Sequence, residues 1–470
     1  MEIGQEAESE KYLLKASRMN DERLQKDPDA DQESVALSYY NLGLLFLGEN
    51  DLEKASAYLE KNFHLLADLL KVNPDQYSGY FAMTCDSLGV VYHHNNRAEK
   101  AETFFENAIR IGEHLVAMNP DQFKGDLALI YNNAFAFFGD QNNYEMASAY
   151  LTKARTLFEE LIQSNPELYS KYLALCYRNT GLFYKKQGDY AESENYLLLS
   201  KAYYERLACG NFHRFACELA DSLCILGVLY DETGELEEAE HCQTEAVKLL
   251  EQLCKTDSKR YEMDLAIGYN NMGHLMMQSD TDRALEYLIK AVHLLERTGN
   301  QHSDTYYEGY SSACNNLGML YKAVGEAEQA VLWLGKSLDI RKQMSKMNPD
   351  RYDSELALGY NNNGIVLLER GDLEEAFSHF KSAIHIYEKT VDSDPEWHRA
   401  ERAVCYANTY MCKYWMDDRE EALEYLLKAR SEYEILAEKN PDVYDEDLSI
   451  CCDNAEILYG EINEKGDNLT

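Results

Sequence analysis

The stretch NPDRYDSELALGYNNNGIVLLERGDLEEAFSHFKSAIHIYEKTVDSDP, residues 348–395, holds one full period of an internal repeat. Its two prolines stand 46 residues apart, and all seven prolines of the 470-residue chain share one phase of that period: Pro28, Pro74, Pro120, Pro166, Pro349, Pro395 and Pro441. Proline ends helices and biases the residue before it away from helical geometry, so the chain is interrupted at this phase. Such a period predicts an all-α fold, an α-solenoid of antiparallel helix pairs.

A glycine marks the same position in most repeats and anchors their alignment. It occurs as Gly43, Gly89, Gly181, Gly227, Gly273, Gly318 and Gly364, while Phe135 and Tyr410 fill the two missing places. A small residue follows eleven or twelve positions later, as Ala55, Ala101, Ala147, Ser193, Ala239, Ala284, Ala330, Ala376 and Ala422. Glycine on one helix and alanine on the next let two helices approach closely. The large rings of Phe135 and Tyr410 predict different packing in repeats three and nine.

Each repeat is predicted to contain a first helix of about 16 residues, as in 354–369, and a second of about 20, as in 373–392. A linker of the form Asn-Pro-Asp-x-aromatic is expected to separate the repeats. The expected repeats are 32–77, 78–123, 124–169, 170–215, 216–261, 262–306, 307–352, 353–398 and 399–444. Residues 1–31 supply a second helix only, and residues 445–470 a first helix or cap. The chain is therefore expected to be either a whole protein with polar caps or a segment of a longer one.

Three features of the repeat resemble the tetratricopeptide repeat family: the run Tyr269-Asn270-Asn271-Met272-Gly273, a tyrosine three residues after the anchor glycine, and the small residues. Repeats of that family usually span about 34 residues. The longer 46-residue form is similar to kinesin-light-chain-type repeats and to Asn-Pro-Asp-linked arrays beside bacterial signalling domains. The resemblance implies a right-handed superhelix whose inner groove binds a peptide or protein partner without catalysis.

The chain is strongly acidic, with 83 Asp and Glu against 45 Lys and Arg and a formal net charge of −38. Such a charge repels phosphate backbones and anionic membranes, so nucleic acid and membrane partners are not expected. It favours a protein or peptide partner with basic segments. The sequence leaves the oligomeric state open.

No residue pattern indicates catalysis or a bound cofactor. The sequence contains no P-loop, GxGxxG, GxSxG or HExxH motif, so an enzyme, a cofactor and a metal site are not expected. The 12 cysteines are interpreted as reduced, apolar packing residues, and the acidic run at 27–31 lacks the glycine of a calcium loop. The chain opens without an apolar segment, and a cytoplasmic location is expected.

The resemblance implies that side chains three positions before and one, four and five positions after the anchor glycine line the inner groove. Four asparagines occupy the first of these positions and could bond an extended peptide backbone: Asn132, Asn270, Asn315 and Asn361. A second asparagine, two positions before the glycine, is expected to tie neighbouring helices together. It occurs as Asn41, Asn133, Asn179, Asn271, Asn316, Asn362, Asn408 and Asn454.

Three local groups on the predicted groove stand out. A basic group in repeat four is a candidate seat for a peptide C-terminal carboxylate or, alternatively, a solvated basic face; it consists of Arg178, Lys185 and Lys186. Aromatic residues in repeat nine could anchor an interface or pack the end repeat, namely Tyr414 and Trp415. Two histidines in repeat two, His93 and His94, could make binding depend on pH.

Two functions fit the sequence. The first is a non-catalytic scaffold that binds a peptide or protein in the groove. The second is a sensor or regulatory module of signalling or defence type, which binds a trigger and controls an attached or co-encoded effector. The linkers after repeats four, five and six lack proline and carry Phe212, Ser258 and Ser303 instead, so that stretch is either a hinge or contact region or a place of surface drift.

Overall fold

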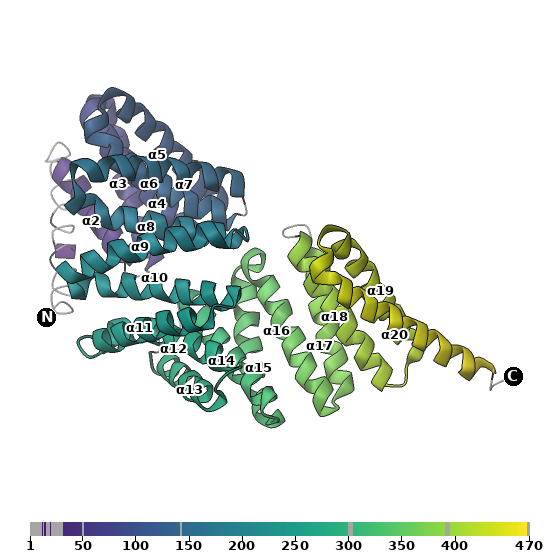
Figure 1. The fold of residues 1–470 in the computed structure, drawn as a ribbon. Helices are drawn as coiled ribbons and strands as arrows, with labels where there is room; N and C mark the ends of the chain where they lie inside the picture. Colours follow the sequence, from purple (N-terminus) through teal and green to yellow (C-terminus); the bar gives the residue numbers. More distant parts are fainter. Residues whose placement is uncertain are drawn as a thin grey trace. The chain divides into compact units, whose positions relative to one another are not determined.

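The computed structural model describes residues 32–48, 51–141, 143–298, 304–390 and 395–467, with the single positions 12, 14, 15 and 19, and these residues form helices joined by short turns (Figure 1). These residues form 19 helices and no strand, as the sequence predicts. The expected second helix within residues 1–31, the acidic run at 27–31 and the position of Ser303 lie outside the described residues.

The chain divides into two compact units, Met1–Ile225 and Leu226–Thr470, and the division falls within one helix, α10 (Phe212–Thr233). The first unit also contains α2 (Gln32–Gly48), α3 (Leu52–Val72), α4 (Pro74–His94), α5 (Ala98–Met118), α6 (Pro120–Asp140), α7 (Tyr144–Ser164), α8 (Pro166–Lys186) and α9 (Tyr190–Gly210). The second contains α11 (Leu236–Cys254), α12 (Ser258–Met276), α13 (Thr281–Thr298), α14 (Asp304–Ala323), α15 (Ala327–Met347), α16 (Pro349–Arg370), α17 (Leu373–Thr390), α18 (Pro395–Trp415), α19 (Arg419–Lys439) and α20 (Pro441–Asp467).

The Asn-Pro-Asp motif begins a helix and is not a linker. In α4 the side chain of Asn73 caps the helix by accepting a hydrogen bond from the Gln76 amide, and Pro74 occupies the first turn. Asparagine is favoured as an N-cap, proline fits where no N–H is needed, and Asp75 in the first turn complements the helix dipole. Where the proline is present, the first helix therefore begins at it, and α4 runs 21 residues. The prediction of about 16 residues was wrong for this reason.

Short turns join the two helices of a pair, and two of them contain the sequence Gly-Asp, at 188–189 and 371–372. Gly188 has a φ of 77° and Gly371 a φ of 91°, values that favour glycine because it has no Cβ. The following Asp189 then caps α9 by accepting a hydrogen bond from the amide of Glu192. The glycine thus allows one helix to end, and the aspartate after it caps the next.

The anchor glycines and the small residues form the contacts between paired helices. A Cβ on Gly43 would lie 2.5 Å from Cγ of Leu59, and one on Gly364 would lie 2.5 Å from Cε1 of Phe380. The small residues of the second helices are fully buried, with 0% exposure at Ala55, Ala101, Ala147, Ser193, Ala239, Ala284, Ala330, Ala376 and Ala422. The predicted close approach of the helices is confirmed.

The first helices of neighbouring repeats also contact one another. Within the first unit α2 contacts α4 and α4 contacts α6, and within the second α12 contacts α14 and α16 contacts α18. The even-numbered helices thus form a layer of their own in each unit. No helix in the described part of the chain combines the length and the apolar character that crossing a bilayer requires.

Candidate functional site

A ladder of side-chain hydrogen bonds runs between the first helices of successive repeats. The asparagine two positions before the anchor glycine donates from Nδ2 to the residue three positions before the glycine in the preceding repeat. The donor–acceptor pairs are Asn133–Asp86 at 2.9 Å, Asn179–Asn132 at 3.1 Å, Asn316–Asn270 at 3.0 Å, Asn362–Asn315 at 2.9 Å and Asn408–Asn361 at 3.0 Å. The prediction that this asparagine ties neighbouring helices together is confirmed for these five of the eight asparagines.

The ladder changes how the four candidate groove asparagines can act. Each already accepts a hydrogen bond through its side-chain oxygen, and Asn270 also donates to Oγ of Ser312 at 3.3 Å. Asn132, Asn270 and Asn361 are buried, and Asn315 is half-buried. Their first role is therefore to hold the repeats in register. The two adjacent asparagines in successive repeats were the signal for this pairing in the sequence.

The basic group of repeat four lies on α8 and is engaged within the first unit. Arg178 donates from Nη1 to Oδ2 of Asp221 on α10 at 3.1 Å. Lys186 lies 5.0 Å from the ring centre of Tyr144, and Lys185 lies in the last turn of the helix. A ligand carboxylate at Arg178 would therefore compete with an internal one.

The two aromatic residues of repeat nine differ in their surroundings: Tyr414 is packed and Trp415 is exposed. Tyr414 donates its hydroxyl hydrogen to Oε1 of Glu461 on α20 at 3.0 Å, and the Arg419 guanidinium lies 3.8 Å from its ring centre. Trp415 is 48% exposed. Tyr414 thus packs against the last helix, whereas Trp415 presents its ring to solvent.

The two histidines of repeat two lie at the end of α4. Nε2 of His93 is 3.0 Å from Oδ2 of Asp140, and its ring meets the ring of Phe137 edge to face at 5.4 Å. The ring of His94 stacks on that of His93, with 5.5 Å between centroids. His93 therefore joins α4 to the end of α6.

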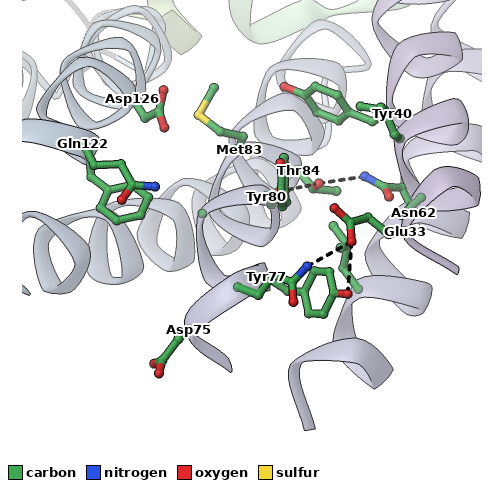
Figure 2. A pocket seen from close by; sticks show the side chains of 16 residues that line it. Glu33, Tyr40, Asn62, Asp75, Tyr77, Tyr80, Met83, Thr84, Gln122 and Asp126 are labelled. Atoms are coloured by element: carbon green, nitrogen blue, oxygen red, sulfur yellow. Dashed lines mark hydrogen bonds between the residues drawn. The ribbon is translucent and has the colours of Figure 1, made fainter. Parts of the chain in front are cut away.

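A groove of about 600 Å³ opens between α2, α3, α4 and α6 of the first unit (Figure 2). Its aromatic walls come from Tyr40, Tyr77, Tyr80 and Phe123, and carboxylates stand at Glu33, Asp75 and Asp126. Tyr77 and Phe123 are the aromatic residues of two Asn-Pro-Asp-x-aromatic motifs. Sequence reasoning missed the groove because it took these motifs for linkers.

Two polar side chains of the groove, Asn62 and Asp126, lack hydrogen-bond partners that they could have among the described residues. Asn62 is 1% exposed; its Nδ2 donates to Oγ1 of Thr84 at 2.8 Å, while its Oδ1 has no hydrogen-bond partner among the described residues. Asp126 forms no hydrogen bond or ion pair with any described residue, and burial raises its pKa. Glu33 is different, because it accepts hydrogen bonds from Nε2 of Gln76 at 2.9 Å and from the Tyr77 hydroxyl at 3.5 Å.

A buried acid lies next to this groove on the ladder. Asp86 is 3% exposed, and burial raises its pKa to about 7 although the hydrogen bond from Asn133 favours the charged form. Its second oxygen, Oδ1, has no partner in the described part of the chain. Burial, and further the charges of Asp86 and Asp126, raise the pKa of Tyr40. Both carboxyl groups therefore act electrostatically on the hydroxyl of Tyr40.

The second unit has a smaller pocket of about 260 Å³ on its own first helices. It is lined by Asn270, by Val228 and His274 one position after their anchor glycines, and by Asp231 four positions after its own. Nε2 of His274 lies 3.9 Å from Oδ2 of Asp231. These are positions that the resemblance assigns to an inner groove, and they include one predicted site residue, Asn270.

All 12 cysteines carry free thiols. Cys85 and Cys314 are completely buried, and burial raises the pKa of each thiol to about 12. Both fill space between helices, as predicted. The described residues contain no group of three or more His, Cys, Asp or Glu side chains placed to hold a metal ion.

The helix pairs, the buried small residues and the layer of first helices agree with two sequence models of the tetratricopeptide repeat. One model matches residues 81–117, 219–258, 311–346 and 356–396, and the other matches 36–61. The chain contains tetratricopeptide repeats in the residues that these models match. No curated protein matches this sequence.

Solved structures share the fold at low sequence identity. A Rap protein complexed with competence and sporulation factor is 15% identical; the match covers 86% of this chain and 98% of that one, with a TM-score of 0.53. BtubC (BKLC) from P. vanneervenii is 20% identical over 53% of this chain and 92% of its own, with a TM-score of 0.44. Kinesin light chain TPR-like repeats from Podosopora anserina are 22% identical over 48% and 98%, with a TM-score of 0.34. The Rap likeness supports the α-solenoid fold and nothing finer.

Proposed function

We propose that this tetratricopeptide repeat protein is a non-catalytic scaffold that binds a peptide or protein on its first helices. The observation that carries the proposal is that each unit is hollowed on this layer, by about 600 Å³ in the first and about 260 Å³ in the second. Concave sites with a few convergent polar groups are typical binding sites. We propose further that residues 32–444 form nine repeats. We also propose that the protein is located in the cytoplasm.

The partner is expected to carry basic segments and to be neither nucleic acid nor membrane. With a formal net charge of −38, the protein attracts cationic segments and repels polyanions. We also propose one place that binds an anion: a peptide C-terminal carboxylate would bind at the basic group of Arg178, Lys185 and Lys186. It would displace Asp221 from Arg178, so Asp221→Asn should strengthen the binding of a peptide with a free carboxylate over its amidated form.

A selection from a random peptide display library tests the proposed function. Enriched peptides should protect backbone amides of even-numbered helices from hydrogen exchange, because those helices line both hollows. Protection confined to odd-numbered helices, or the absence of any enriched peptide, would contradict the proposal.

One observation favours a sensor or regulatory module as the second candidate. The two compact units divide within α10, in the stretch where Phe212 and Ser258 replace the repeat proline. Proline restricts the backbone, so its absence removes a local constraint there. A peptide that acts as a trigger should change the radius of gyration in small-angle scattering, and an unchanged value would favour the plain scaffold.

A further inference from the structure

We infer that the groove of the first unit receives a lysine or arginine side chain of an extended peptide partner, next to an apolar residue of the same peptide. This inference rests on the proposed function and adds the chemistry that the groove recognises. The basic side chain would lie at the part of the groove formed by Tyr40, Met83 and Asp126. The apolar neighbour would pack against Leu37, Tyr80 and Phe123.

The charge of the lining selects a cation. The groove is lined by 16 described residues, of which three are carboxylates and none is lysine or arginine. Two lysines are adjacent in sequence to lining residues: Lys124 forms an ion pair with Glu160 at 2.7 Å, and Lys61 lies over the rings of Tyr39 and Tyr58. A cationic ligand would therefore meet uncompensated negative charge, whereas a carboxylate ligand would be repelled.

One of these carboxylates, Asp126, lies in the groove without an ion-pair or hydrogen-bond partner among the described residues. Figure 2 shows the Asp126 carboxylate and the Tyr40 hydroxyl on either side of Met83. Asp126 has no hydrogen bond or ion pair among the described residues, and desolvation without a partner disfavours its charged form. A ligand ammonium or guanidinium would provide the missing partner.

The side-chain amide of Asn62 provides a second and independent observation. Asn62 lines the same groove with a side chain that is 1% exposed, and its Oδ1 atom has no hydrogen-bond partner in the described part of the chain. Buried acceptors in folded proteins are usually satisfied, by a protein group, water or a ligand. A basic side chain in the groove would bring several donors close to this amide, three from lysine or five from arginine.

The rest of the lining suits the carbon atoms of the peptide. Leu37 is 52% exposed and Tyr80 is 54% exposed, and Phe123 on α6 lines the same groove. Apolar surface of this kind packs against the aliphatic stem of lysine or arginine and against a neighbouring apolar side chain. Aromatic faces also attract cations directly.

The test selects peptides from a random display library on the full-length protein and then measures the best peptide by fluorescence anisotropy. We expect the enriched peptides to share a lysine or arginine beside an apolar residue. Replacing that arginine by uncharged citrulline, or that lysine by norleucine, should weaken binding about tenfold or more. Asp126→Asn should have a similar effect, because it removes the charge and keeps the shape of the side chain.

A matched control separates the groove from the general acidity of the protein. Glu145→Gln removes one negative charge from an exposed position on α7, outside the groove, and should change the affinity less than about twofold. Enriched peptides without a basic residue, or equal effects of the two variants, would overturn this inference and leave the proposed scaffold function standing. The absence of any enriched peptide would overturn the proposed function and this inference with it.

Discussion

Replacing Asp86 by asparagine should make the protein more stable, although it changes a fully packed residue. Asp86 takes the place that asparagine holds in other rungs of the ladder, and it accepts a hydrogen bond from Asn133 at 2.9 Å. An asparagine at position 86 would keep an oxygen for that bond. It would also remove a charge that is buried with no opposite charge bonded to it.

The size of the effect follows from the raised pKa of Asp86. Burial moves this pKa from 3.8 to about 7, and each unit corresponds to about 1.4 kcal/mol. Below pH 3.8 the carboxyl is protonated in both the folded and the unfolded chain, so it carries no penalty. The penalty grows as the pH rises through the window between 3.8 and about 7, because only the unfolded chain then loses the proton. Asp86→Asn should therefore gain about 4 kcal/mol at about pH 8 and about 2 kcal/mol at about pH 5.5.

Urea denaturation of the wild type and the variant at both pH values measures this difference. Comparing the two chains at each pH cancels the titration of all other groups. The transition to follow is that of the first unit, because a chain of two compact units need not unfold in one step. A variant that is less stable than the wild type at the higher pH, or a gain that does not fall with pH, would refute the reasoning.

Three further predictions concern the packing of the repeats. Gly318→Ala should destabilise the second unit by about 1–3 kcal/mol, since its Cβ would lie 2.7 Å from Cγ of Leu334; the control Gly335→Ala meets no atom within 4 Å and should stabilise it by about 0.5–1 kcal/mol in the same thermal melt. Asn362→Ala should cost about 1 kcal/mol and speed hydrogen exchange in α16, because it removes one rung of the ladder; an unchanged rate would contradict this. Asn165→Ala should lower the stability of α8 by about 1 kcal/mol in urea titrations, whereas Asn165→Asp should keep it because a carboxylate accepts the same capping bond; equal losses in the two variants would argue against the cap.

The sequence alone was sufficient for the helix pairs and their contacts. The spacing from Gly43 to Ala55 returns in repeat after repeat, and steric demands confine such a spacing to small residues. The structure buries these positions completely, as that reasoning requires. Local and periodic information was enough here, because each contact lies within one repeat and is copied in the next.

The sequence was less informative where one motif serves two purposes or where partners come from different repeats. Asn73 and Pro74 are as typical of a loop as of a helix start, and only the cap geometry distinguishes the two. The acceptor of Asn179 is Asn132, 47 positions away, so the pairing depends on how the repeats stack. The groove depends on the same stacking, since its walls come from four helices.

Asp86 affects both the stability of the fold and the electrostatics of the groove. Asparagine would serve the ladder better at this position, and a buried carboxyl with a pKa of about 7 lowers the stability of the fold at neutral pH. The charge nevertheless acts on Tyr40, the same hydroxyl that faces Asp126 across Met83 in the groove. Functional sites commonly hold groups that the fold alone would not favour. A cation bound near Tyr40 would favour the charged forms of the carboxyl groups that act on this hydroxyl, and it would offset part of the free energy that Asp86 costs the empty protein.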